Sequence, residues 1–412
     1  MWWRAYSLGA VLWCSLAGLA WADGGLFFQS VADAGTSGDQ RGIILFDGTQ
    51  ETLILQTVAQ DPQSGYAWII PTPHVVPEGA VTEIDTTVFD DMDYLTAPVI
   101  LDDTAPGYSG GGKFGCGIMG AAPGDGNGAG HQAVTVWGTT RVGDYEVSVL
   151  TASDSAALTT WLTDHGYALP SAAEPVLARY IHDEWAFTAV RVATLPAERS
   201  RLSLDPLALT FPVTKAVFPL VISQVSAAPS EVSAVQIYVL ADSHVDATPY
   251  ATVALDTSEL RGSDAFDAYA ERAREQSTSG EPAFVVEFSS FVATDSVPEA
   301  LRGLPGFPNL AGSQGNETGA HVTRVRAYLG AADMFEDVVF TAAPDNAPTW
   351  DETWWTGGPA LHFAGAATQR AAAQLAPGVV VGLCVGAICR GKPRRRLACA
   401  MVAMVLVILA VM

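Results

Sequence analysis

The chain is poor in basic residues, and its body contains a single cysteine. It carries 21 Lys and Arg against 44 Asp and Glu among 412 residues, so its formal net charge is −23. Six of the basic residues lie in the two hydrophobic ends, namely Arg4 and the five in residues 390–396. Without these six, 15 basic residues face 44 acidic residues, which leaves a net charge of −29. This excess of negative charge argues against nucleic acid and anionic lipid as partners of the body, and it allows a basic or cationic partner.

The placement of the five cysteines excludes a disulfide scaffold. Four of them lie in the two ends of the chain: Cys14, Cys384, Cys389 and Cys399. Cys116 is therefore alone in the body, and no two cysteines have the CxxC spacing of a metal site. We interpret Cys116 as a spare thiol, with an intermolecular link as the alternative.

Several widespread catalytic motifs are also missing. The sequence contains no H-E-x-x-H, no P-loop and no S-x-x-K. None of the seven histidines forms an i, i+4 pair: His74, His131, His165, His182, His244, His321 and His362. Gly115, Gly117 and Gly120 match the dinucleotide fingerprint formally, but more glycine precedes them where a strand is needed. We predict neither a cofactor nor a metal and assign no catalytic residue. These absences argue strongly against the common metalloproteases and nucleotide hydrolases, and only weakly against enzymes in general.

Acidic residues are concentrated at positions 90–103. Five aspartates form this cluster: Asp90, Asp91, Asp93, Asp102 and Asp103. Calcium takes such carboxylates, but the spacing is not that of an EF-hand, so we favour solvated carboxylates. The sequence at 125–128 resembles a fragment of a calcium loop and lacks the distal acid. A thermal melt that a chelator leaves unchanged would eliminate a calcium-stabilised module.

The most distinctive stretch predicts a core hairpin followed by a buried strand. The apolar run at 43–46 precedes Asp47-Gly48, a strong hairpin-turn signal, and a second strand-like run follows at 52–58. A third strand at 66–70 is apolar on both faces and ends at prolines, so we place Trp68 in the core rather than in a ligand site.

Periodicity predicts further elements along the chain. Helices are expected at 86–95, 154–165, 171–183 and 263–276, and strands at 133–137, 145–150, 283–293, 322–329 and 337–341. The segment 185–255 is rich in further strands. His165 and His182 fall near helix ends, where a histidine is more often a cap than a ligand. The predicted fold class is α+β, with strand-dominated antiparallel sheets and a few amphipathic helices.

Four of these stretches together resemble one family of exported bacterial proteins, the domain of unknown function 2330. They are YAWIIPTP after ILFDGTQETLILQTVAQD, residues 141–150, residues 158–170 and residues 322–340, and they span most of residues 24–343 in order. Members often begin with Cys-Gly-Gly after the signal peptide, whereas this chain has Asp23-Gly24-Gly25. The resemblance implies export and supplies no activity, substrate or site residue.

Both ends are hydrophobic. Residues 1–22 read as a signal peptide that ends at Ala20-Trp21-Ala22, with a retained anchor as the alternative. The tail has apolar runs at 377–389 and 397–412 around the basic loop 390–396. Because positive loops stay in the cytoplasm, we expect the tail to cross the membrane and the main domain to lie in the periplasm or at the cell surface. A sorting tail that is cleaved, and one crossing instead of two, remain alternatives.

These patterns predict the following domains: a signal peptide at 1–22, an exported α+β domain at 23–343 with two subdomains divided near 194–205, a linker at 344–373, and a transmembrane or sorting tail at 374–412. The linker carries Trp350, Trp354 and Trp355, which form an interfacial aromatic belt or dock on the body.

Two functions follow as hypotheses. The first is a non-enzymatic binding or structural module, anchored to the membrane through its tail, at the surface or in the periplasm. The alternative is an extracellular hydrolase that uses Asp and Glu carboxylates, because carboxylates are plentiful. The sequence identifies no protein partner for either.

The predicted topology can be tested by labelling the basic loop. In a chain without its native cysteines, a Lys392→Cys variant should resist an impermeant thiol reagent applied to intact cells, because the loop lies in the cytoplasm. Permeabilised cells should show labelling. Labelling of intact cells would contradict the topology, and no labelling in either case would indicate that the tail has been removed.

Overall fold

The computed structural model describes about three fifths of the chain. The described residues are 25–28, 40–56, 58–60, 66–97, 99–102, 133–165, 173–192, 201–203, 205–227, 232–255, 265–308, 310–311, 318–345, 349–350 and 352–355. By its contacts the chain divides into one unit of Met1–Leu101 and Pro106–Trp355, and another of Asp102–Ala105 and Thr356–Met412. All described elements except the last residue of one strand belong to the first unit.

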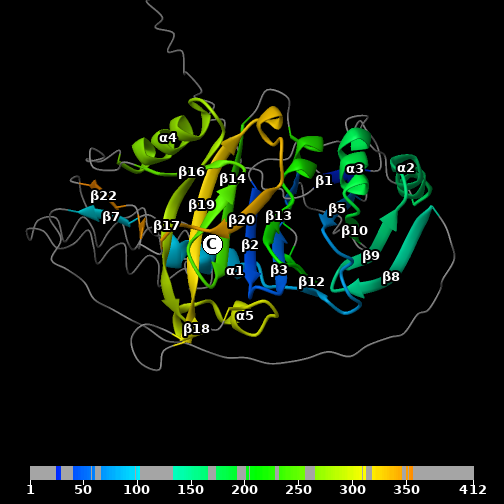
Figure 1. Cartoon of the computed structure of the whole chain (residues 1–412), viewed down its shortest axis with the longest axis horizontal. Coiled ribbons are helices and arrows are strands. Elements are labelled where there is room, and N and C mark those ends of the chain that lie inside the picture. Colours follow the sequence, from blue (N-terminus) through cyan, green and yellow to red (C-terminus); the bar gives the residue numbers. More distant parts are fainter. Residues whose placement is uncertain are drawn as a thin grey trace, which may run out of the picture. The chain divides into compact units, whose positions relative to one another are not determined.

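A ten-stranded sheet is the largest element of this unit (Figure 1). Its main path runs through β16 (Ala251–Ala254), β17 (Ala283–Ala293), β19 (Thr318–Leu329), β14 (Ser233–Ala241), β2 (Gln40–Phe46), β3 (Gln50–Gln56), β12 (Leu207–Pro212) and β6 (Val81–Glu83). Two short strands complete it, because β18 (Leu310–Ala311) pairs with β19 and β21 (Thr349–Trp350) pairs with β17.

The α+β, strand-dominated fold is confirmed in the described residues, but this sheet is mixed rather than antiparallel throughout. Two of its pairs are parallel, β2 with β14 and β16 with β17, and the others are antiparallel. Parallel neighbours need a long crossover connection. The chain between β2 and β14 provides one, since it forms most of a second sheet before it returns.

That second sheet has five strands and two helices. Its strands are, in order, β1 (Gly25–Phe28), β5 (Tyr66–Thr72), β10 (Ala186–Val192), β9 (Tyr145–Ala152) and β8 (Val134–Val142). Helices α2 (Ser155–Asp164) and α3 (Ala173–His182) pack on one of its faces through Leu158, Leu162 and Leu177. The predicted central strand is confirmed, and Trp68 in it is 1% exposed and belongs to the core. Strand β5 extends through Pro71 to Thr72, whereas its pairing with β1 reaches only Ile69.

Smaller sheets accompany these two. One contains β13 (Ala216–Phe218), β20 (Val338–Ala342) and β15 (Val245–Thr248), a second pairs β11 (Arg201–Ser203) with β4 (Val58–Gln60), and a third pairs β22 (Glu352–Trp355) with β7 (Val99–Asp102). The strand prediction near 337–341 is therefore confirmed, but this strand pairs outside the large sheet.

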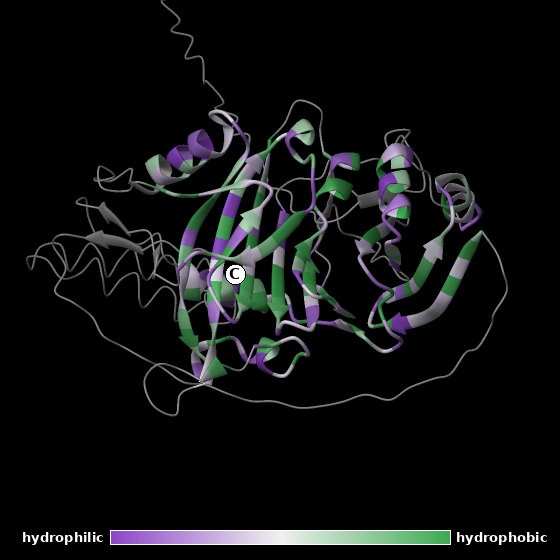
Figure 2. Ribbon diagram, viewed as in Figure 1, coloured by the Kyte–Doolittle hydropathy of each residue, from purple (hydrophilic) through white to green (hydrophobic). Residues whose placement is uncertain are grey.

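Both faces of the ten-stranded sheet are buried, each against a different layer. One face packs Ile44 and Leu53 against Trp68 and Val147 of the five-stranded sheet. The opposite face packs Ile43 and Ile54 against α1 (Thr87–Thr96) and α5 (Glu299–Arg302). Helix α4 (Ala265–Thr278) covers the same face at β17 through Tyr269 and Ala273. In Figure 2, hydrophilic segments interrupt the largely hydrophobic strands of this sheet.

Local signals account for the hairpin and the helix ends. Gly48 has a φ of 89°, which the turn requires, and Asp47 Oδ1 accepts hydrogen bonds from the Thr49 and Gln50 N–H groups at 2.9 and 3.0 Å. Asp154 caps α2 by accepting from the Ala157 N–H at 2.7 Å. His165 is the C-terminal cap of α2, and its Nδ1 lies 2.7 Å from the Trp161 carbonyl oxygen, so its interpretation as a cap is confirmed.

The predicted ends of the chain lie outside the described residues. Among the helices that the structure describes, none combines the length and the apolarity that a membrane crossing requires. The signal peptide, the tail, Cys116 and the Gly-rich segment near it are not described. The domain boundaries stay predictions. Within the predicted linker, the backbone of β21 pairs Trp350 with Phe288 of β17.

A close approach at Gly42 of β2 makes the central hairpin sensitive to one methyl group. A Cβ at Gly42 would lie 2.6 Å from Cε2 of the fully buried Phe218. We expect Gly42→Ala to lower the free energy of unfolding by about 1–3 kcal/mol, because the ring has no space into which to move. Denaturant titration measures this loss. Gly138→Ala is the matched control, since no described atom lies within 4 Å of its added Cβ. Equal effects of the two substitutions would contradict the explanation.

Candidate functional site

A row of polar side chains crosses four neighbouring strands of the ten-stranded sheet, on the face that carries α1 and α4. The register sets Arg41 of β2 opposite Gln236 of β14, and Gln236 opposite Arg326 of β19. We name the whole group the arginine cluster, and it consists of Arg41, Asp93, Gln236, Tyr238, Tyr269, Glu287, Arg324 and Arg326. Its members come from four strands and two helices, so only the folded chain assembles it.

Asp93 of α1 joins one half of this cluster. Its carboxylate forms ion pairs with Arg41 and, at 3.3 Å, with Arg324 Nη1. It also accepts hydrogen bonds from the Tyr238 hydroxyl at 2.5 Å and from Gln236 Nε2 at 3.0 Å. Arg41 donates in addition to the Phe89 carbonyl oxygen at 3.0 Å and lies over the Phe89 ring. These contacts fix the last turns of α1 to strands β2, β14 and β19.

Glu287 of β17 joins the other half. It is fully buried, and its oxygens lie 2.6 Å from Arg324 Nε and 2.9 Å from Arg326 Nε. The Tyr269 hydroxyl of α4 donates to it at 3.2 Å. Arg326 and Arg324 also donate to the Gln236 amide oxygen, the latter at 3.3 Å. Because Arg324 contacts both carboxylates, the two halves form one network.

The charges of the cluster are set by its arginines. Burial opposes ionisation of Asp93, but Arg41 and Arg324 hold its pKa below the ordinary value. Burial likewise opposes ionisation of Glu287, and Arg326 and Arg324 lower its pKa. Burial and the neighbouring Asp93 charge raise the pKa of Tyr238 to about 12, so this phenol is neutral at pH 7. Both carboxylates are ionised, which gives three positive charges against two negative ones.

Sequence reasoning missed this cluster. Asp93 was expected to be solvated with its neighbours, and the structure corrects this, because two arginines hold it although it keeps 36% of its side chain exposed. Asp91 is exposed, as expected. One signal was present, since Arg324 and Arg326 alternate with valines in a strand whose apolar residues indicate burial. Alternation places both arginines on one face. Their carboxylate partners come from other elements and could not be selected from the sequence.

An open cleft of about 520 Å³ lies at the β12 and β6 edge of the same sheet. Eleven residues line it: Gln50, Pro77, Glu78, Gly79, Ala80, Thr82, Thr210, Phe211, Pro212, Leu304 and Pro305. Its volume is within the roughly 300–1,000 Å³ of small-molecule sites. The Thr52 hydroxyl donates to the Pro305 carbonyl oxygen at 2.7 Å, which holds the loop after α5 against the strands. Glu78 is the one charged side chain among these eleven residues.

The expected pair of hydrolase carboxylates does not line this cleft. Beside it, burial and the charges of Asp205 and Asp144 raise the pKa of Glu83.

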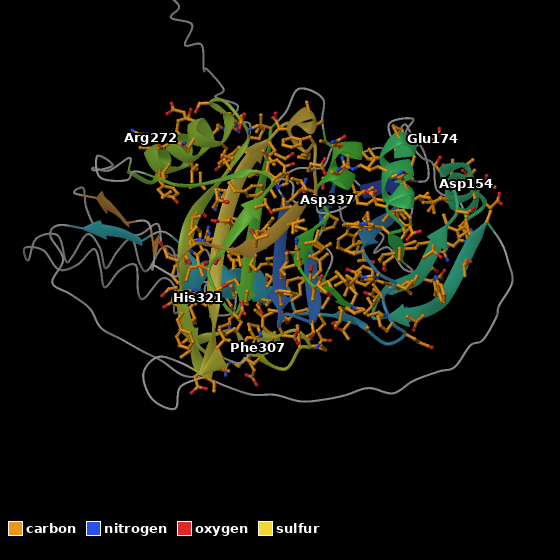
Figure 3. All side chains as sticks on the ribbon, in the orientation of Figure 1. Asp154, Glu174, Arg272, Phe307, His321 and Asp337 are labelled. Carbon is orange, nitrogen blue, oxygen red and sulfur yellow. The ribbon has the colours of Figure 1, made fainter. Side chains whose placement is uncertain are left out.

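The remaining sequence candidates are dispersed. His321 lies at one end of β19 (Figure 3), where burial and the neighbouring His244 lower its pKa. No group of three or more His, Cys, Asp or Glu residues that could hold a metal ion occurs in the described part of the chain. The Gly-rich segment lies outside that part. It contains Gly107-Tyr108-Ser109-Gly110-Gly111, which fits the spacing of a nucleophile elbow.

A partly buried carboxyl joins α3 to the three-stranded sheet. Asp337 Oδ1 accepts hydrogen bonds from the Tyr180 hydroxyl at 2.6 Å and from the Val221 N–H at 2.9 Å (Figure 3). The Tyr180 hydroxyl itself accepts from the Ile222 N–H at 3.1 Å. Burial raises the pKa of Asp337 to about 6 despite these donors. The junction is structural and lies apart from the cluster and the cleft.

The comparison with protein families gives one match. A family described as an uncharacterized protein conserved in bacteria, domain of unknown function 2330, matches residues 21–341. The chain belongs to this family. The match covers more than half of the chain and confirms the resemblance carried by the hairpin and the later stretches. The arginine cluster and the cleft both lie within the residues that match this family. No curated protein and no solved structure matches the chain.

Asp337 predicts how stability depends on pH. Its pKa is about 6 in the folded protein and about 3.9 in an unfolded chain, so the folded state binds more protons between these values. Its contribution to the free energy of unfolding is therefore present below pH 4 and is lost as the pH rises to 6, by roughly 3 kcal/mol. Asp337→Asn keeps the accepting oxygen and removes the titration.

Stability curves of both proteins between pH 4 and pH 7 test this prediction. We expect the stability of the parent minus that of Asp337→Asn to fall by roughly 2 kcal/mol over this range. Subtracting the two stability curves cancels the contributions of the other titrating groups. A difference that does not change with pH would show that the carboxyl titrates normally.

Proposed function

We propose that the protein is an exported, membrane-anchored binding module that takes a small cationic ligand in the cleft. The observation that carries the proposal is the cleft itself, whose size suits a small molecule and whose one charged lining group is the carboxylate of Glu78. Export and anchoring are supported by the hydrophobic ends of the sequence, and we propose no catalytic step.

The lining favours a ligand with an apolar body and one positive group. Pro77, Pro212 and Pro305 supply apolar surface, while the Thr82 and Thr210 hydroxyls supply polar groups at the same wall. A ligand ammonium would meet Glu78 with no competing lysine or arginine among the lining residues. The surplus of acidic residues over the body also attracts cations at long range.

Calorimetric titration with phenethylammonium tests the proposal, and 2-phenylethanol is the matched neutral probe. We expect the ammonium to bind the full-length chain roughly fivefold or more tightly than the alcohol, because only the former pairs with Glu78. Glu78→Gln should remove this preference, and Thr82→Trp should block both probes by filling the cleft. Glu174→Gln, on helix α3 (Figure 3), is the matched control for loss of one carboxylate.

Four results would contradict the proposal. Three of them are the absence of binding, equal binding of the ammonium and the alcohol, and a preference that persists in Glu78→Gln. Binding that survives Thr82→Trp would place the ligand elsewhere and would also contradict it.

A further inference from the structure

The arginine cluster carries one more positive charge than negative charge. Arg41, Arg324 and Arg326 face two ionised carboxylates, those of Asp93 and Glu287. Burial of an ion that has no counter-charge costs several kcal/mol of free energy. An anion that reaches the cluster would therefore be favoured there, although the body as a whole is acidic.

The unbalanced charge is accessible at one arginine. The side chains of Arg41 and Arg324 are 8% and 3% exposed, whereas that of Arg326 is 25% exposed. The inner contacts of Arg326 run through Nε, beside Glu287, and through Nη2, which donates to Gln236. Both contacts hold the guanidinium plane in place, so an approaching anion would meet a fixed donor.

A second arginine lies next to this exposed group. Tyr328 follows Arg326 by two residues on the same face of β19, and it joins Glu287 in raising the pKa of Arg326. The guanidinium carbon of Arg274, on α4, lies 5.3 Å from the centre of the Tyr328 ring. Arg274 is exposed, and the ring positions it beside the cluster. We name Arg274, Arg326 and Tyr328 the outer rim.

We propose that the outer rim binds the carboxylate group of a small acid, with Arg326 and Arg274 as donors. A guanidinium presents parallel N–H groups that match the two oxygens of a carboxylate. A single negative charge balances the single excess positive charge of the cluster. A dianion such as phosphate would overcompensate it and would also be repelled more strongly by the acidic body.

Thermal melts of the full-length chain in sodium acetate test this site, with sodium chloride of equal ionic strength as the reference. We expect acetate to raise Tm above the chloride value by about 2–5 °C in a saturating manner. Arg274→Gln should raise the half-saturating acetate concentration roughly three- to tenfold, because it removes one donor and leaves the buried pairs intact. Arg141→Gln, on the exposed turn side of β8, is the matched control and should respond as the parent does.

Arg326→Lys completes the test at the buried end of the rim. It keeps the charge that pairs with Glu287 and removes the fork, so the acetate response should fall while the folded state is kept. Equal melting in acetate and chloride would overturn the proposal, as would an acetate response unchanged in both Arg274→Gln and Arg326→Lys. A phosphate response that exceeds the acetate response at equal ionic strength would overturn the carboxylate assignment. These melts do not involve the cleft, since Glu78 repels acetate.

Discussion

Burial of both faces of the ten-stranded sheet is the constraint on which the rest of the structure depends. Ile43 and Ile44 are neighbours in β2, point to opposite faces and are both fully buried. A sheet of this kind needs one layer on each side. The five-stranded sheet and its two helices supply one layer, and α1, α4 and α5 supply the other. The long excursion of the chain between β2 and β14 follows from this need, because it builds one layer before the sheet is completed.

The same constraint explains the arginine cluster. Charged side chains on a covered face must be paired, since an unpaired buried ion costs several kcal/mol. Glu287 lies beneath α4 and is held by two arginines of the adjacent strand, and Asp93 reaches the sheet from α1. Removal of one partner from such a pair costs about 3–5 kcal/mol, whereas a well-packed apolar replacement of the whole group is often neutral. Stability alone therefore does not require three arginines here, and ligand recognition gives the excess charge a role.

Local features of the fold could be predicted from the sequence, and long-range ones could not. The Asp47-Gly48 turn and the helices predicted at 154–165 and 263–276 depend on residues close in sequence, and all three agree with the structure. The parallel pairing of β2 with β14 joins segments about 195 residues apart, such as Ile43 and Tyr238, and no local pattern specifies it. The candidate sites could not be predicted from the sequence for the same reason. In the sequence Asp93 is one of several neighbouring aspartates, and only the fold brings Arg324 to it.

Net charge is a poor guide to what each part of this surface can bind. Charges in solution are screened within about 8–10 Å at physiological ionic strength, so the acidic total governs approach more than contact. At contact distance, the cleft offers one carboxylate among apolar groups, while the outer rim offers two guanidinium groups beside a tyrosine. The two sites thus prefer ligands of opposite charge although they share one sheet. Because guanidinium remains charged throughout the physiological pH range and the Glu287 carboxylate beneath it has a lowered pKa, the preference of the rim follows from fixed charges and persists across that range.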